Sequence, residues 1–386
     1  MTILRATVVA ASLATLLVGC SQTTDPVYIA NDNIAPYKQA TFDQYLAETE
    51  QWLIEHRHFV SDNQQKELDA VMPFEIVPSN PNGEGILLVH GLSDSPYSFV
   101  DMAPVLAEQG YLVRAILLPG HGSKPADLQL VELEDWNEIV EHHTQLLQNQ
   151  VDKVWLGGFS TGTNLVTHYA ASHSDDVEGL ILVSTAYHPR DPMAKYTPYA
   201  KWFSDWVDQE LESNHTRYSS FSMHGAATYY QSTKQVKSHI ENKQVSLPTF
   251  MILSEADETI DSQYAVDAFQ MNFTHPNSRA LWFGETAYAD TRITQYSMDL
   301  PKQQIFSGSH LSPLFSPENT VYNKNGEIRF CFEQQPETSA TPCELSNNVW
   351  FGAYGLGDET AQRARLSWNP YFDETMDALL VFLAEN

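Results

Sequence analysis

Residues 153–166 read Lys153-Val-Trp-Leu-Gly-Gly-Phe-Ser160-Thr-Gly-Thr-Asn-Leu-Val166. The apolar start predicts a strand, residues 161–172 predict a helix, and the sequence Gly-x-Ser160-x-Gly joins them. A sharp strand-to-helix turn needs small residues, because the backbone crowds the serine. Such a turn raises the Ser160 hydroxyl above the carboxyl edge of a sheet, over a helix N-terminus that favours a developing anion. This context predicts Ser160 as a nucleophile; the alternative is an ordinary glycine-rich turn.

The segments on either side of this turn alternate between strand and helix patterns. Continuous apolar runs predict strands buried on both faces, and apolar residues at helical spacing predict helices between them. This alternation indicates an α/β protein with a mostly parallel sheet and helices on both faces. Strands are expected at 85–89, 111–117, 153–157, 179–184, 248–253 and 279–283, with an extra pairing in 291–306; helices are expected at 41–58, 95–110, 134–149, 161–172, 261–271 and 370–385.

A serine nucleophile needs a carboxylate and a histidine, which follow it in the order Ser, Asp or Glu, His on this type of sheet. The acid belongs in the loop at the carboxyl end of a later strand. Asp257 lies there, directly after the strand expected at 248–253. Three neighbouring carboxylates remain alternatives: Glu255, Glu258 and Asp261.

Only two histidines, His275 and His310, follow Asp257 in the chain. His275 comes between a helix and the next strand, which places it at the opposite edge of the sheet. His310 follows the last expected strand pairing in a Gly/Ser loop, so it is predicted as the base. The alternative for His310 is a surface loop histidine.

The tetrahedral oxyanion of acyl transfer requires two hydrogen-bond donors. The backbone N–H of Thr161, directly after the nucleophile, is one prediction. The loop after the first strand, His90-Gly91-Leu92-Ser93, supplies the other. We assign it to the Leu92 N–H, with Ser93 as the alternative, and expect His90 to have a structural role.

These segments resemble the α/β-hydrolase superfamily, in particular bacterial carboxylesterases, monoacylglycerol lipases and lysophospholipase-like serine hydrolases. The resemblance rests on Leu87-Leu-Val-His-Gly-Leu92, Leu118-Pro-Gly-His-Gly-Ser123, the turn at 158–162 and the Asp257 loop. It implies a catalytic triad of Ser160, Asp257 and His310, with Leu92 and Thr161 as oxyanion donors. It also implies a cap, here an aromatic-rich insertion at about 187–246, and a small apolar ester as substrate.

The resemblance implies hydrolysis of carboxylic esters through an acyl-serine, with no cofactor and no metal. Two other functions stay open: amide or aminopeptidase chemistry on the same triad, and a non-catalytic binding module on a hydrolase fold. A second, loop-rich insertion is expected at about 311–368. The hydrolase domain, with both insertions, is expected to span 41–386.

The first 19 residues have the dimensions of a signal peptide, with Arg5 before an apolar run too short to span a membrane. The sequence Leu17-Val-Gly-Cys20 resembles a bacterial lipobox, which implies lipidation of Cys20 and an anchor in the cell envelope. The outer membrane, facing periplasm or exterior, is the expected location, with residues 20–40 as a tether. An ordinary secretory signal is the alternative.

The chain of 386 residues carries 21 Lys plus Arg against 49 Asp plus Glu, a formal net charge of −28. Nucleic-acid binding is therefore not expected, because binding to phosphates requires positive charge. Export implies an oxidising compartment, where Cys331 and Cys343 are expected to form a disulfide. Two free thiols are the alternative, and the oligomeric state is left open.

Overall fold

The computed structural model describes residues 25–241, 244–336, 339 and 341–386. The predicted signal peptide and lipidated Cys20 lie outside these residues. Within them, no helix combines the length and the apolar character needed to cross a bilayer.

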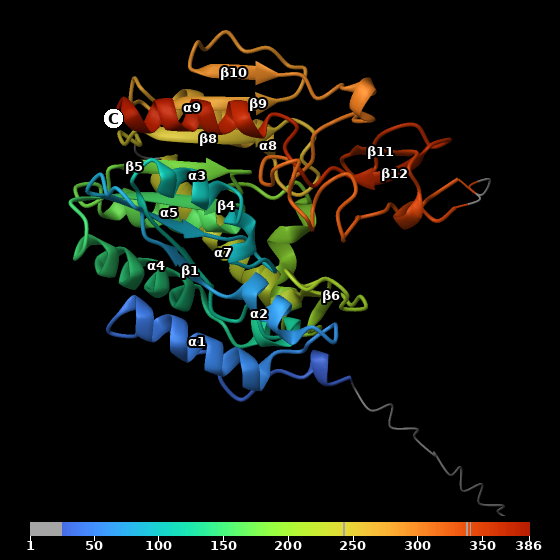
Figure 1. Cartoon of the computed structure of the whole chain (residues 1–386), viewed down its shortest axis with the longest axis horizontal. Helices are drawn as coiled ribbons and strands as arrows, with labels where there is room; N and C mark the ends of the chain where they lie inside the picture. Colours follow the sequence, from blue (N-terminus) through green and yellow to red (C-terminus); the bar gives the residue numbers. More distant parts are fainter. Residues whose placement is uncertain (1–24, 242–243, 337–338, 340) are drawn as a thin grey trace, which may run out of the picture.

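The centre of the molecule is an eight-stranded sheet in the order β1-β3-β2-β4-β5-β8-β9-β10 (Figure 1). Only β1 is antiparallel to its neighbour, and the other pairs are parallel, which confirms the predicted α/β fold class. The sequence analysis missed β1, a three-residue edge strand too short to show a periodic pattern. The strands are β1 Phe74–Ile76, β2 Glu84–Val89, β3 Leu112–Ile116, β4 Lys153–Phe159, β5 Gly179–Val183, β8 Thr249–Ser254, β9 Arg279–Phe283 and β10 Ile293–Tyr296.

Helices cover both faces of this sheet, and the side chains of β2 divide between two apolar cores. Ile86 and Leu88 join one core with α3 and α9, whereas Leu87 and Val89 join the other with α4, α5 and α8. This alternation follows from the two-residue period of a strand and explains why β2 is apolar throughout. The helices are α1 Phe42–His56, α2 Gln64–Val71, α3 Met102–Glu108, α4 Leu133–Gln148, α5 Thr161–Ser172, α7 Met223–Ile240, α8 Ser262–Asn272 and α9 Phe372–Ala384.

Three expectations differ from the structure. The helix expected at 95–110 is split into a 3₁₀ turn, Pro96–Phe99, and α3. Helix α2 was not expected. Residues 25–40, expected to be tether, pack against the domain: Val27 is buried and the Asn31 amide donates to Asp127. The folded domain therefore includes these residues.

Two insertions extend from the carboxyl edge of the sheet. The first, between β5 and β8, contains a 3₁₀ turn Pro192–Tyr196, α6 Thr197–Ala200, the hairpin β6 Trp206–Asp208 and β7 Phe221–Ser222, and α7, which packs on α5. The second follows His310 and forms the lobe at the right of Figure 1. It contains the parallel pair β11 Val349–Gly352 and β12 Gln362–Arg365, and a disulfide joins Cys331 to Cys343.

Candidate active site

Ser160 occupies the sharp turn between β4 and α5. Its backbone has φ 50° and ψ −119°, a strained conformation for a residue other than glycine. The turn is possible because the residues two positions before and after Ser160 are glycines. A Cβ on Gly162 would lie 1.9 Å from the Val89 carbonyl oxygen, and one on Gly158 would lie 2.6 Å from the Gly162 carbonyl carbon.

The structure brings Ser160, His310 and Asp257 into one hydrogen-bonded chain. His310 Nε2 lies 2.9 Å from Ser160 Oγ, and His310 Nδ1 lies 2.7 Å from Asp257 Oδ2. An ionised carboxylate only accepts hydrogen bonds, so Nδ1 carries the proton and Nε2 is free to accept from the serine hydroxyl. All three residues are buried.

Further hydrogen bonds hold Asp257 and His310 in place. The Thr259 and Ile260 N–H groups donate to Asp257 Oδ1 at 2.8 and 2.9 Å. The Ser184 hydroxyl donates to the His310 carbonyl oxygen at 2.8 Å, and the His310 N–H donates to Glu258 at 3.3 Å. The backbone of His310 is therefore held by two hydrogen bonds, in addition to the bond that its ring makes with Asp257.

The three alternative acids make other contacts. The Glu255 carboxylate accepts from Glu285 N and Thr286, and Asp261 accepts from the Tyr264 N–H at the start of α8. The Glu258 side chain pairs with Arg365 at 2.5 Å. Asp257 is the one of the four that contacts the His310 ring. His275 lies in the turn that leads into β9, at the edge of the sheet away from Ser160.

The two predicted oxyanion donors, Leu92 and Thr161, line the same cavity as Ser160. The alternative donor, the Ser93 N–H, instead donates to His121 Nε2 at 3.1 Å. Burial lowers the pKa of His121 to about 4, so the ring stays neutral and can accept this bond at neutral pH. His90 Nε2 accepts from the Leu118 N–H, which is the structural role expected for it.

Ser160 and His310 open into a cavity of about 370 Å³ between the two insertions. Its apolar wall includes Phe221 and Tyr229 from the cap, as expected from the aromatic composition. It also contains Arg217 and Arg365, which sequence reasoning missed because they come from segments without a recognisable motif.

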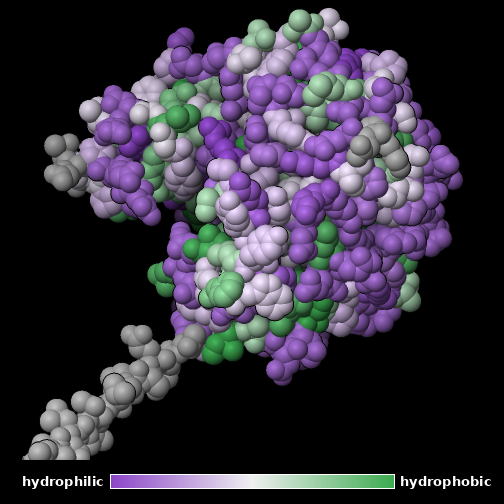
Figure 2. Space-filling view, turned by 180° about the vertical axis from the view of Figure 1, so that it is seen from behind, coloured by the Kyte–Doolittle hydropathy of each residue, from purple (hydrophilic) through white to green (hydrophobic). Residues whose placement is uncertain are grey.

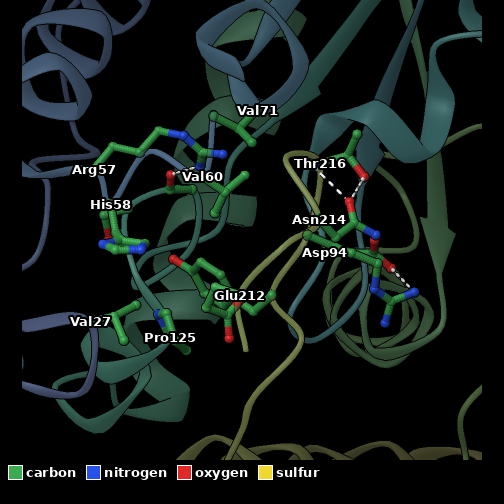
Figure 3. A pocket seen from close by; sticks show the side chains of 14 residues that line it. Val27, Arg57, His58, Val60, Val71, Asp94, Pro125, Glu212, Asn214 and Thr216 are labelled. Atoms are coloured by element: carbon green, nitrogen blue, oxygen red, sulfur yellow. Dashed lines mark hydrogen bonds and ion pairs between the residues drawn. The ribbon is translucent and has the colours of Figure 1, made fainter. Parts of the chain in front are cut away.

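Each arginine faces a carboxylate, which is buried in Asp94 and partly buried in Glu258. Arg365, on β12, pairs with Glu258, and Arg217 lies 3.9 Å from Asp94, which is labelled at the right of Figure 3. Burial raises the pKa of Asp94, and the Arg217 charge partly offsets this effect. The pairs add charged and polar groups to the cavity wall.

Figure 3 shows a second, much smaller cavity, of about 10 Å³, on the other side of Asp94 and Arg217. Its walls include Arg57, Glu212 and Asn214. This volume is at the limit for one water molecule, so it is too small for a substrate. Among the described residues, no group of three or more His, Cys, Asp or Glu side chains is placed to hold a metal ion.

Comparisons with known proteins agree with this fold. A family model described as "alpha/beta hydrolase fold" matches residues 85–297. The chain is 33% identical over 102 residues to a thermostable monoacylglycerol lipase of Bacillus sp., an alignment that covers 26% of this chain and 40% of the lipase. It is 27% identical over 184 residues to a pimeloyl-[acyl-carrier protein] methyl ester esterase of Chromobacterium violaceum, covering 45% of this chain and 68% of the esterase.

One solved structure, described as "LipS and LipT, two metagenome-derived lipolytic enzymes", superposes with a TM-score of 0.50. It shares 18% identity and covers 57% of this chain and 91% of its own. At this identity the likeness concerns the fold alone.

Proposed function

Because the chain belongs to the α/β-hydrolase fold family, we propose that it hydrolyses carboxylic esters through an acyl-Ser160 intermediate. The observation that carries this proposal is the hydrogen-bonded chain from Ser160 Oγ through His310 to Asp257. Its relatives include enzymes named as a lipase and an esterase, which supports ester hydrolysis over other reactions of the fold.

In the proposed mechanism, His310 Nε2 takes the hydroxyl proton while Ser160 Oγ attacks the ester carbonyl carbon. The oxyanion accepts hydrogen bonds from the N–H of Leu92, in the loop after β2, and from the N–H of Thr161, at the start of α5. His310 then gives the proton to the leaving alcohol, and a water molecule repeats the sequence to release the acid. Asp257 holds the ring in the correct tautomer and stabilises its charged form.

The cavity supports a small substrate with an apolar part. Its volume of about 370 Å³ is near the lower end for ligand sites, and Phe221 and Tyr229 provide apolar surface beside Ser160. Anchoring through a lipidated Cys20 in the cell envelope remains part of the proposal and rests on the lipobox-like sequence alone.

The test is Ser160→Ala, assayed with short-chain p-nitrophenyl esters and aminoacyl-anilides. Loss of the nucleophile is expected to reduce kcat for esters by at least about 10⁴-fold, with an unchanged circular dichroism spectrum. A fluorophosphonate probe is expected to label the wild-type chain and not the variant. Undiminished ester turnover in the variant contradicts the proposal, turnover of anilides alone selects amide chemistry, and absence of labelling selects a non-catalytic role.

A further inference from the structure

The cap presents an unusual concentration of exposed apolar side chains. Of the fifteen large apolar side chains that are exposed among the described residues, seven lie between positions 193 and 211. They are Met193, Tyr196, Tyr199, Trp202, Phe203, Val207 and Leu211. Trp202 and Phe203 are 78% and 91% exposed, so these two side chains contribute little to the packing of the fold.

The centre of this concentration is residues 192–204, which we call the aromatic ledge. None of its residues is buried, although it contains the 3₁₀ turn Pro192–Tyr196 and helix α6. The ledge contains no Asp or Glu, in a chain with 49 of them. Its only charges are Lys195 and Lys201, whose ammonium groups lie 5.0 and 5.7 Å from the ring centres of Tyr196 and Trp202.

We infer that the aromatic ledge binds the surface of a lipid bilayer. Tryptophan and tyrosine concentrate at membrane interfaces, because their rings are apolar and their N–H or O–H groups stay hydrated. Lysine stems lie along apolar surface while the ammonium groups reach the headgroups.

The start of the described chain lies beside the same part of the cap. The Tyr28 ring packs edge-on against Trp206, 5.2 Å between centres, and the Tyr28 hydroxyl donates to the Glu210 carbonyl oxygen. Cys20 precedes Asp25 by five residues, which span at most about 18 Å when fully extended. A lipid on Cys20 would therefore hold this edge of the molecule close to the bilayer.

The surface view agrees with this placement. Figure 2 shows green and near-white side chains gathered at the lower left, below a hollow in the surface. This is the side on which Figure 1 shows β6. The ledge leads directly into β6, whose Val207 lines the catalytic cavity. Insertion of the ledge would therefore bring the mouth of the cavity to the lipid, a consequence that rests on the proposed function.

Tryptophan fluorescence in phosphatidylcholine vesicles with brominated acyl chains tests the inference on the full chain. Residues 1–24 contain no tryptophan, so quenching by bromine does not come from the anchor itself, and the variants below assign it to a tryptophan. Wild type is expected to be quenched, and Trp202→Phe to lose at least half of that quenching. The matched control Trp350→Phe, on β11 of the other insertion, is expected to retain it.

A second pair of variants tests the ledge without removing its probe. In a chain that carries Cys20→Ser and so has no lipid anchor, Phe203→Asp is expected to raise the lipid concentration for half-maximal quenching about tenfold, since burial of one Phe side chain contributes at least a factor of ten. Met271→Asp, at another exposed position, on α8, is expected to leave it unchanged. Neither residue contacts the triad, so both variants are expected to keep turnover of a soluble ester.

The outcomes separate this inference from the proposed function. A Ser160→Ala chain is expected to show the same quenching as wild type, because membrane binding needs no catalysis. Quenching that survives both Trp202→Phe and Phe203→Asp overturns the inference. The inference is also overturned if sedimentation velocity without lipid shows a dimer for wild type and a monomer for Phe203→Asp. That result would assign the ledge to contact with a second copy of the chain.

Discussion

Replacing Gly162 by alanine tests whether the position of Ser160 depends on the close packing of the turn. The added Cβ would lie 1.9 Å from the Val89 carbonyl oxygen, whereas ordinary contact begins at 3.4 Å. Strand β2 is a central strand of the sheet and cannot retreat, so the N-terminus of α5 must move by about 1.5 Å. The 2.9 Å bond between Ser160 Oγ and His310 Nε2 cannot survive a displacement of that size.

The expected losses follow from this displacement. Misplacing a catalytic group by about 1 Å costs roughly 100-fold in rate, so kcat/KM for a short-chain p-nitrophenyl ester is expected to fall at least about 100-fold. Overpacking against backbone is expected to lower the free energy of unfolding by about 3 kcal/mol, measured by urea denaturation. If the variant folds and keeps kcat/KM within about threefold of wild type, the reasoning about this turn is wrong.

Gly225→Ala is the matched control. The nearest atom to its added Cβ would be Leu92 Cδ1 at 3.3 Å, the end of a flexible side chain. Gly225 lies inside α7, where alanine is favoured over glycine by about 1 kcal/mol. Unchanged activity and equal or higher stability are therefore expected for this variant.

Three further predictions concern the surroundings of the site. Because burial lowers the pKa of His121 from 6.5 to about 4, the unfolded chain takes up a proton at pH 5 that the folded chain does not. The free energy of unfolding falls between pH 7.5 and pH 5, and this fall is expected to be about 2 kcal/mol smaller in His121→Gln than in wild type. Equal falls in the two proteins would contradict the lowered pKa of His121. Arg365→Met leaves the partly buried Glu258 without its partner and is expected to cost about 2–3 kcal/mol in urea denaturation, most of it recovered by adding Glu258→Gln; no recovery would exclude the ion pair as the cause. Cys343→Ser opens a disulfide between residues twelve positions apart and is expected to cost about 3 kcal/mol, so reductant should lower the urea midpoint of wild type but not of the variant.

Much of the fold is visible in the sequence because parallel strands and their helices carry strong local patterns. The apolar run of β2 predicts a strand buried on both faces, and the glycines around Ser160 predict a tight turn before α5. Chain order and the position of a residue after a strand were enough to select Asp257 and His310 as hypotheses, since the carboxyl ends of parallel strands share one edge.

Other features depend on contacts between segments far apart in the chain. The three-residue strand β1 and the pair β11–β12 have no pattern long enough to distinguish them from loop, because neighbouring strands decide their conformation. For the same reason the sequence does not indicate that Arg365 lines the cavity. Arg365 reaches the cavity only because β12 packs beside the Asp257 loop.

The aromatic residues of the cap show the limit most clearly. Composition alone indicates an apolar cap, but the same side chains could line the cavity, pack on the core or face outward. The sequence by itself determined the sheet, the turn that holds Ser160 and the order of the residues around it, because backbone geometry and strand polarity are local constraints. Only the tertiary structure decided that Phe221 faces the cavity and Phe203 faces solvent, because the direction of each side chain depends on which distant segment covers it.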